Sequence, residues 1–425
     1  MSMIALVDCN ACYVSCEQIF RPDLRGKAVV VLSNNDGCII ARSKEAKLLG
    51  IADLSPYFKQ KALLDLHKVK VFSANFRLYG DVSNQVMENL RSFSPRVEQY
   101  SIDEMFLDVD RFVDGSENSN LNQYALKMKA TLWRHVRMPV GVGVAPTKTL
   151  SKLANHAAKH IKKDGVAVLD TPEKWQWLQR RLPVNKIWGI GSQLTKRLNM
   201  LGIRTAYELA QADPKQIRRL TSVNVEKTIS ELNGECCIEL EEVMVPKKEI
   251  FVTRSFAKKI SRLPDLLGHI SRYATAAAEK LRRQDSYCQQ LYVFVRTSRF
   301  KEDYYTNSVE ARLPYPTSDT AVLIHYAKQA MMTLYKSDCL FAQCGIGLLD
   351  IRHRCFYQTD FLMPEQSSKT DCLMQTLDKV NQRYGRDTLT FGAEGLLGRW
   401  TMKQAKLSPS YTSSWKDLPR INCSL

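Results

Sequence analysis

Residues 250–350 contain apolar segments in an order that few folds accommodate. Short β-branched runs predict four strands, over 250–256, 290–297, 308–313 and 342–349. Apolar residues spaced three and four apart predict two helices, over 264–283 and 320–335. This βαββαβ order is typical of a ferredoxin-like layer, in which helices pack on one face of a sheet. We therefore expect an α+β domain here, preceded by a linker at Pro246-Lys247-Lys248.

The rest of the chain predicts a multidomain α+β protein. Its 425 residues are enough for roughly two to four domains. Before residue 183, predicted strands over 4–7, 28–32 and 139–144 are interspersed with predicted helices over 81–90, 121–136 and 149–161. Short helices follow from about residue 183. Residues 351–425 predict a partly ordered tail with a Ser/Thr-rich end.

The charge of the chain favours a polyanionic partner. There are 61 Lys and Arg residues against 44 Asp and Glu residues, a net charge of +17. Such a surplus is most often found in nucleic-acid-binding proteins, although a generally basic protein is the alternative. The excess lies outside residues 1–110, which hold 13 basic and 14 acidic residues, whereas residues 246–350 hold 16 and 10.

The composition also bears on location and cofactors. No apolar run reaches the roughly 18–20 residues of a membrane span, and the N-terminus lacks the basic start of a signal peptide. We therefore expect a cytoplasmic protein without a membrane partner. The twelve cysteines show no paired spacing typical of zinc ligands, so reduced thiols are expected.

Acidic residues stand at the ends of predicted strands. Asp8 ends the first strand, and Asp103-Glu104 lies between two others, over 96–101 and 105–109. Three carboxylates that converge on one sheet edge would repel one another unless cations bridged them, and oxygen ligands of this kind suit Mg²⁺. Two such ions can activate a 3′-hydroxyl and stabilise a leaving pyrophosphate. The alternative is that these acids only cap or solvate turns.

Two motifs carry a family resemblance. Leu6-Val7-Asp8-Cys9-Asn10-Ala11-Cys12-Tyr13-Val14-Ser15-Cys16-Glu17 resembles the opening motif of Y-family DNA polymerases. About 95 residues later, Tyr100-Ser101-Ile102-Asp103-Glu104-Met105-Phe106-Leu107-Asp108 resembles their second metal motif. Segments 30–38 and 407–412 resemble, more narrowly, a bacterial branch of the family whose members work with a UmuD′ homodimer. The resemblance covers essentially the whole chain.

The resemblance implies a right-hand polymerase built from five parts. These are a ferredoxin-like palm (1–20 and 78–165), small fingers (21–77), a helical thumb with a helix-hairpin-helix (166–242), a βαββαβ little finger (243–350) and a C-terminal interaction tail (351–425). It further implies that Asp8, Asp103 and Glu104 are catalytic and hold two Mg²⁺ ions. The carbonyl of Cys9 would complete a metal shell. Asn10 replaces an Asp found in many relatives, at a position not expected to be a main ligand.

The resemblance also implies a nucleotide pocket. Tyr13 would be the steric gate that lies under the sugar and excludes a 2′-hydroxyl, the alternative being a packed aromatic. Lys47, at a position that is often Arg, and Lys159 would bind the triphosphate, and Arg42 lies near enough to share this role. Lys44 stands where the family pattern usually has Tyr.

Several basic or glycine positions are expected to contact DNA. Lys148 and Lys152 lie on one helical stripe with Lys159. Gly189 and Gly191, followed by Leu198, Leu201-Gly202-Ile203 and Leu209, fit a helix-hairpin-helix whose backbone N–H groups face a phosphate. Arg254, Lys258 and Lys259 are placed at the end of a predicted strand, where they would grip phosphates unless they are only solvated charges.

The sequence thus predicts a Y-family DNA-directed DNA polymerase for error-prone translesion synthesis in the SOS response. Its substrates would be primer-template DNA and dNTPs. A palm-fold nucleotide cyclase and a non-catalytic damaged-DNA-binding scaffold are the alternatives. The resemblance implies a UmuD′ homodimer, a RecA filament and the sliding clamp as partners. A degenerate clamp motif, with Gln358, Phe361 and Leu362, could equally be a plain hydrophobic anchor.

Overall fold

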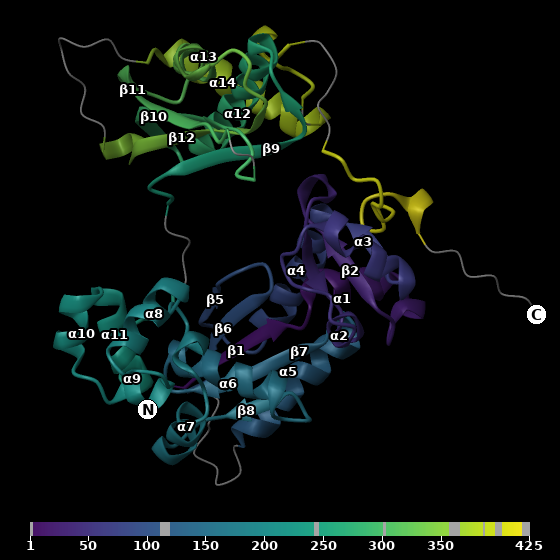
Figure 1. Ribbon diagram of the computed structural model, residues 1–425, viewed down its shortest axis with the longest axis vertical. Coiled ribbons are helices and arrows are strands. Elements are labelled where there is room, and N and C mark those ends of the chain that lie inside the picture. Colours follow the sequence, from purple (N-terminus) through teal and green to yellow (C-terminus); the bar gives the residue numbers. More distant parts are fainter. Residues whose placement is uncertain are drawn as a thin grey trace, which may run out of the picture. The chain divides into compact units, whose positions relative to one another are not determined.

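The computed structural model describes residues 3–110, 120–241, 246–300, 303–356, 366–385, 387–395 and 402–418. The chain forms two compact units. The first contains residues 1–244 and 404–425, and the second contains residues 245–403. In the first unit, the described residues from 404 to 418 lie beside the N-terminal part of the chain (Figure 1).

A five-stranded sheet forms the centre of the first unit. Its strand order is β5-β6-β1-β7-β8, and β1 pairs antiparallel with both β6 and β7. The bounds are β1 Ile4–Cys9, β5 Val97–Gln99, β6 Glu104–Asp108, β7 Val140–Ala145 and β8 Val166–Val168. β1 is continuously apolar up to Asp8 because both of its faces are covered.

Helices cover both faces of this sheet. α4 (Phe76–Arg91) and α5 (Leu121–His135) pack their apolar stripes on the face that contains Ala5, Val7 and Met105. α6 (Lys148–His160) packs on the other face, where Ser151 Oγ donates to the carbonyl of Ile4 at 2.7 Å and Asn155 Nδ2 to that of Gly141 at 2.9 Å. α6 therefore lies directly over the strand that carries Asp8.

Two glycines of β7 allow α6 to come this close. A Cβ atom at Gly143 would lie 2.2 Å from the backbone nitrogen of Asn155, and one at Gly141 would lie 3.0 Å from Cγ of Lys159. Gly141 is the register partner of Asp8. The glycine spacing thus brings the C-terminal half of α6 up against the end of β1.

The remainder of the first unit consists of a small sheet and a set of short helices. The small sheet has the order β3-β2-β4, with bounds β2 Val29–Leu32, β3 Ile39–Arg42 and β4 Lys70–Ser73. The helices near it are α1 Cys12–Phe20, α2 Lys44–Leu48 and α3 Tyr57–Leu66. The later helices are α7 Pro172–Gln179, α8 Ser192–Met200, α9 Ala206–Ala210, α10 Pro214–Leu220 and α11 Val223–Leu232.

The second unit has the predicted βαββαβ order. Its elements are β9 Ile250–Ile260, α12 Leu263–Arg283, β10 Ser286–Arg296, β11 Thr306–Thr317, α13 Thr320–Leu334 and β12 Phe341–His353. The sheet order is β11-β10-β12-β9, so each strand–helix–strand unit is split by a strand of the other. α12 and α13 share one apolar core with the sheet.

The expected tail over 351–425 is divided differently in the structure. β12 continues to His353, and α14 (Ser368–Tyr384) packs on the second unit, where Arg282 forms a bidentate ion pair with Asp378 at 2.6 and 2.7 Å. Residues from 404 onward belong to the first unit instead. Among the helices that the structure describes, none is long and apolar enough to cross a membrane.

Candidate active site

Two of the predicted acids lie side by side on the sheet. Asp8 is the register partner of Glu104, which is the first residue of β6. Directly opposed residues of an antiparallel pair project from the same face, so both carboxylates lie on the face that α6 covers. Burial raises the pKa of Asp8 to about 6, although Lys159 lowers it, and the charges of Glu104 and Asp103 raise it further. The acids are therefore close enough to interact.

Asp103 is held at the turn before β6. Ser101 Oγ donates to the Asp103 carboxylate at 2.6 Å and accepts the backbone N–H groups of Asp103 and Glu104. The backbone N–H of Cys9 donates to the Asp103 carbonyl at 2.9 Å, which ties this turn to the end of β1. The sequence analysis did not single out Ser101, whose position two residues before Asp103 is the only signal that could have identified it.

The three lysines of α6 face acids of the sheet. Lys159 Nζ lies 2.6 Å from Asp8, and Lys152 Nζ lies 2.9 and 3.0 Å from the two oxygens of Glu104. The third lysine, Lys148, is paired with Glu98 of β5, and both side chains are buried. The three lysines thus lie along α6 as predicted, but in the structure each pairs with an acidic side chain of the protein itself.

This arrangement corrects one prediction. Lys148 was expected to contact DNA, but its side chain is only 2% exposed and its ammonium is paired with Glu98. A buried, paired charge cannot reach a phosphate without unpairing Glu98. The side chain of Lys152 is 16% exposed, and its ammonium is paired with Glu104.

A cavity of about 370 Å³ brings most of the predicted nucleotide-site residues together. Its walls include Asp8, Cys9, Tyr13, Arg42, Lys47, Asp103 and Lys159. The cavity is thus lined by acidic side chains, basic side chains and the aromatic ring of Tyr13. Glu104 does not line this cavity in the structure, in agreement with its pairing to Lys152.

Tyr13 lies on α1, five residues after Asp8. Its half-buried ring stacks on Tyr79 of α4, with centroids 4.8 Å apart and planes 17° from parallel, and meets the edge of Phe76. Tyr13 is therefore packed against the rings of α4 and also lines the cavity.

Arg42 enters the cavity wall from β3. Its guanidinium donates to the carbonyl of Ile51 at 2.5 Å and pairs with Asp53 at 3.1 Å. Lys47, on the short helix α2, lines the same cavity. The basic lining residues of the cavity thus come from the small sheet, α2 and α6.

The donor set suits a hard divalent cation, since it consists of carboxylate oxygens near a backbone turn. Across the described residues, no three His, Cys, Asp or Glu side chains converge closely enough to hold an ion. Two of the three predicted acids are paired with lysines instead, Glu104 with Lys152 and Asp8 with Lys159. The residues fit Mg²⁺ chemically, and a lysine ammonium stands beside two of the three acids.

Comparisons with known proteins identify the family of the chain. The impB/mucB/samB family model matches residues 7–156, and the model of that family's C-terminal domain matches residues 247–361. Protein UmuC of Salmonella typhimurium is 42% identical over 99% of this chain and 100% of its own length. The chain belongs to the impB/mucB/samB family. Protein ImpB of the same species is also 42% identical, over 98% of this chain and 99% of its own.

The solved structures show the same fold. A chimera of the Y-family DNA polymerases Dbh and Dpo4 superposes with a TM-score of 0.67 at 22% identity, covering 83% of this chain and all of its own. The expected assignment to a UmuC-like Y-family DNA polymerase is confirmed. A further family model, described as a domain of unknown function (DUF4113), matches residues 371–421 of the chain.

The predicted helix-hairpin-helix is present. The IMS family HHH motif matches residues 172–203. Gly189 has a φ of +83°, a conformation that favours glycine, and Gly191 is the N-cap of α8. Both glycines are exposed, and a Cβ at either would meet nothing within 4 Å. Open backbone at a helix start fits the expected phosphate contact.

An aromatic cluster that the sequence analysis did not find connects this region to the acids. Trp188 packs edge-on against Tyr100, and Lys152 Nζ lies 4.4 Å from the Tyr100 ring centre and 5.3 Å from that of Trp188. The rings hold the ammonium that pairs with Glu104. No local pattern predicts this contact, because Trp188 is 36 residues beyond Lys152.

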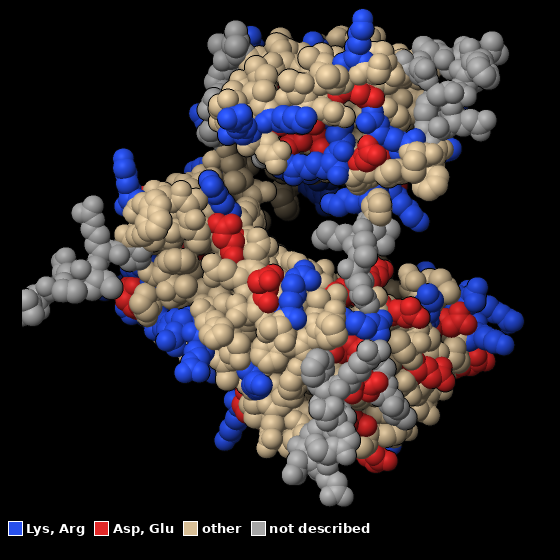
Figure 2. Space-filling view, turned by 180° about the vertical axis from the view of Figure 1, so that it is seen from behind, with Lys and Arg blue, Asp and Glu red and all other residues tan. Residues whose placement is uncertain are grey.

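The basic residues of the second unit lie within a strand. Arg254, Lys258 and Lys259 are exposed residues of β9, the edge strand of the sheet, whereas a strand end or loop was expected. Figure 2 shows Lys and Arg side chains gathered on one face of this unit, with a few acids among them. Gln358, Phe361 and Leu362 of the clamp motif lie outside the described residues.

Proposed function

We propose that this UmuC-like polymerase adds dNTPs to a primer 3′-hydroxyl opposite damaged templates, as a Mg²⁺-dependent enzyme of the SOS response. The observation that carries the proposal is the cavity that joins Asp8, Asp103 and Tyr13 to Arg42, Lys47 and Lys159. Such a cavity offers carboxylates for metal ions, cations for phosphates and a flat ring for a sugar.

The acids and the lysines have separate roles in this proposal. Asp8, Asp103, Glu104 and the Cys9 carbonyl would hold two Mg²⁺ ions. These ions, when bound, would activate the primer hydroxyl and stabilise the pyrophosphate. Lys159 would leave Asp8 for the triphosphate, where Arg42 and Lys47 also bind.

Tyr13 is proposed to select the sugar. Its ring is supported by Tyr79 and cannot retreat without disturbing α4. A deoxyribose would fit against the ring, and a 2′-hydroxyl would overlap it.

The parts outside the cavity are proposed to hold DNA. The backbone at Gly189 and Gly191 would bind a phosphate, as would Arg254, Lys258 and Lys259 of β9. Contacts of this kind read no base sequence, which suits an enzyme that must accept any template. In this proposal residues 1–20 and 78–165 form the palm, 21–77 the fingers, 166–242 the thumb and 243–350 the little finger.

The family resemblance supports the remaining proposals. A UmuD′ homodimer and a RecA filament would activate the enzyme in the cytoplasm, and the segment that contains Gln358 would bind the sliding clamp.

Primer extension tests the proposal. Asp103→Asn removes one metal-binding charge and should lower extension at least about a thousand-fold, since two-metal sites supply several kcal/mol of transition-state stabilisation. Asp170→Asn, which alters an exposed acid paired with Lys174, is the matched control and should extend normally. If Asp103→Asn extends primers at the rate of this control, the reaction does not take place at this site.

A further inference from the structure

The last described residues of the chain are bound to the first unit by hydrogen bonds. Lys406 exchanges two of them with Ser73, its N–H donating to the Ser73 hydroxyl and its carbonyl accepting the Ser73 N–H, both at 2.9 Å. The N–H of Ala405 donates to the buried carboxylate of Asp36 at 2.9 Å, and Gln404 Nε2 donates to the Ala74 carbonyl at 2.9 Å. The segment is therefore an ordered part of the unit.

An aromatic anchor follows. Tyr411 is only 8% exposed and belongs to the same apolar core as the central sheet. Its ring stacks on Phe20 of α1, with centroids 4.7 Å apart and planes 5° from parallel. Thr412 Oγ1 donates to Asp81 of α4. Residues 404–412, which we name the C-terminal strap, thus contact both α1 and α4.

The strap also reaches the nucleotide cavity through a chain of contacts. Ser408 Oγ donates to Oε1 of Glu17 at 3.0 Å, and the Tyr79 hydroxyl donates to the same oxygen at 2.7 Å. Glu17 is fully buried in α1, and the ring of Tyr79 stacks on Tyr13. Ser408 itself accepts from Asn75, the N-cap of α4.

We propose that the C-terminal strap is a positioning element of the nucleotide site. It holds α1 and α4 in one arrangement, so that Tyr79 supports the ring of Tyr13 against the sugar. Side chains that contact a substrate need such a supporting layer, because a shift of about 1 Å can cost a hundred-fold in rate. The inference rests on the proposed role of Tyr13. It gives a function to the end of the domain of unknown function that matches residues 371–421.

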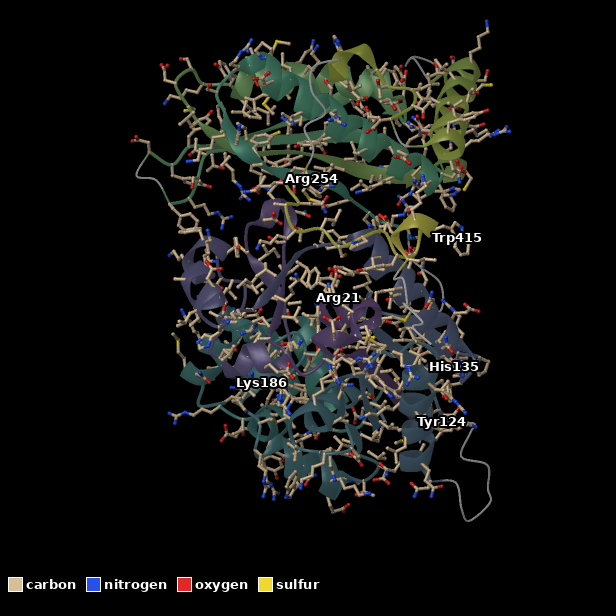
Figure 3. The ribbon with its side chains drawn as sticks, turned by 90° about the vertical axis from the view of Figure 1, so that its right-hand side faces the viewer. Arg21, Tyr124, His135, Lys186, Arg254 and Trp415 are labelled. Carbon is tan, nitrogen blue, oxygen red and sulfur yellow. The ribbon has the colours of Figure 1, made fainter. Side chains whose placement is uncertain are left out.

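Single-nucleotide insertion by the full-length chain tests the strap, with kcat and KM measured for dNTPs and rNTPs. Tyr411→Ala removes the anchor and should raise KM for dNTPs about ten-fold, within the range that such misplacement causes. It should also raise the rNTP/dNTP ratio several-fold. Tyr411→Phe keeps the stack and should restore wild-type values. Trp415→Ala is the matched control, because Trp415 lies just beyond the strap and its side chain is 92% exposed and points outward (Figure 3).

The outcomes separate the strap from the proposed gate. Tyr13→Ala, measured in parallel, tests whether Tyr13 selects the sugar. If this variant leaves the rNTP/dNTP ratio unchanged, the proposed role of Tyr13 is wrong, and the role of the strap is then judged from the KM of Tyr411→Ala alone. An unchanged KM and ratio in Tyr411→Ala overturn the strap, and so does a lower kcat with both unchanged, which would show only a stability role. If Tyr411→Ala does not fold, Ser408→Ala, which leaves the stack intact, is judged by the same two measurements.

Discussion

The two larger sheets of this protein are built from the same kinds of element, yet their charged residues are arranged in opposite ways. In the five-stranded sheet, Asp8, Glu104 and Glu98 are each paired with a lysine of α6 and are partly or fully buried. In the four-stranded sheet, Arg254, Lys258 and Lys259 are exposed along an edge strand. A charged side chain that is paired and partly buried is held in one position, whereas an exposed charged side chain can move to meet its partner. Substitutions should therefore have large, specific effects in the first sheet and small, additive effects in the second.

The largest expected effect on stability is at the buried pair of the first unit. Lys148→Ala leaves Glu98 buried without its cation, which should lower the free energy of unfolding by about 3–5 kcal/mol. Denaturant unfolding measures this. The double variant Lys148→Met/Glu98→Gln removes both charges and should recover most of the loss. If the single variant is as stable as wild type, the comparison between the sheets fails.

The two units should also respond oppositely to pH. Burial raises the pKa of Glu17 in α1 to about 7, so the folded chain holds this proton more tightly than the unfolded chain does. The contribution of Glu17 to stability is therefore present at low pH and is lost as pH rises from about 4.5 to about 7, by up to about 3 kcal/mol.

In the second unit, burial lowers the pKa of His269 on α12 to about 4. The unfolded chain therefore takes up the proton first, and stability is lost as pH falls from about 6.5 to about 4. Unfolding measured across this range for Glu17→Gln and His269→Gln should show each variant losing one of the two dependences. A variant that keeps the full wild-type profile contradicts the assignment of that residue.

A smaller effect is expected at the cavity. Tyr13→Ala removes the ring that overlaps a 2′-hydroxyl, an overlap worth about 1–3 kcal/mol. The rNTP/dNTP ratio of insertion should rise about ten- to a hundred-fold, while extension with dNTPs persists because no acid is lost. Tyr57→Ala, at a tyrosine outside the cavity lining, serves as the control and should keep the wild-type ratio.

The smallest effects are expected in the second sheet. Each phosphate that Arg254, Lys258 or Lys259 no longer neutralises should make the log–log salt dependence of DNA binding about 0.9 shallower on duplex. Alanine at all three positions should lower affinity for every sequence alike, as titrations at several salt concentrations would show. An unchanged slope would assign DNA binding to another face.

The sequence predicted the parts of the fold and site that follow from local pattern. The βαββαβ order, the lysine stripe and the placement of Asp8 and Asp103 depend on residues close together in the chain, which periodicity and motifs report. The partners of these residues could not be predicted in the same way. Helical spacing puts Lys148 on a stripe with Lys152, but it does not say that Glu98, 50 residues earlier, covers that end.

The strap shows the same limit at greater range. Ser408 meets Glu17 across 391 residues, and no spacing rule connects them. The sequence predicted only a partly ordered tail over 351–425, with a Ser/Thr-rich end. In the structure Ser408 donates to the buried Glu17 and Thr412 donates to Asp81, and these hydrogen bonds hold the segment on the first unit.

One paired measurement tests the central claim most directly. Glu104→Gln and the triple alanine variant of Arg254, Lys258 and Lys259 are compared on one primer-template, with the single-turnover extension rate and the Kd for DNA both measured. The account predicts that Glu104→Gln loses extension by about a thousand-fold or more with an unchanged Kd, since only transition-state stabilisation is removed. The triple variant should show a weaker Kd and a near-normal rate at saturating DNA. Near-normal extension by Glu104→Gln, or loss of chemistry in the saturated triple variant, would contradict the division of roles between the two sheets.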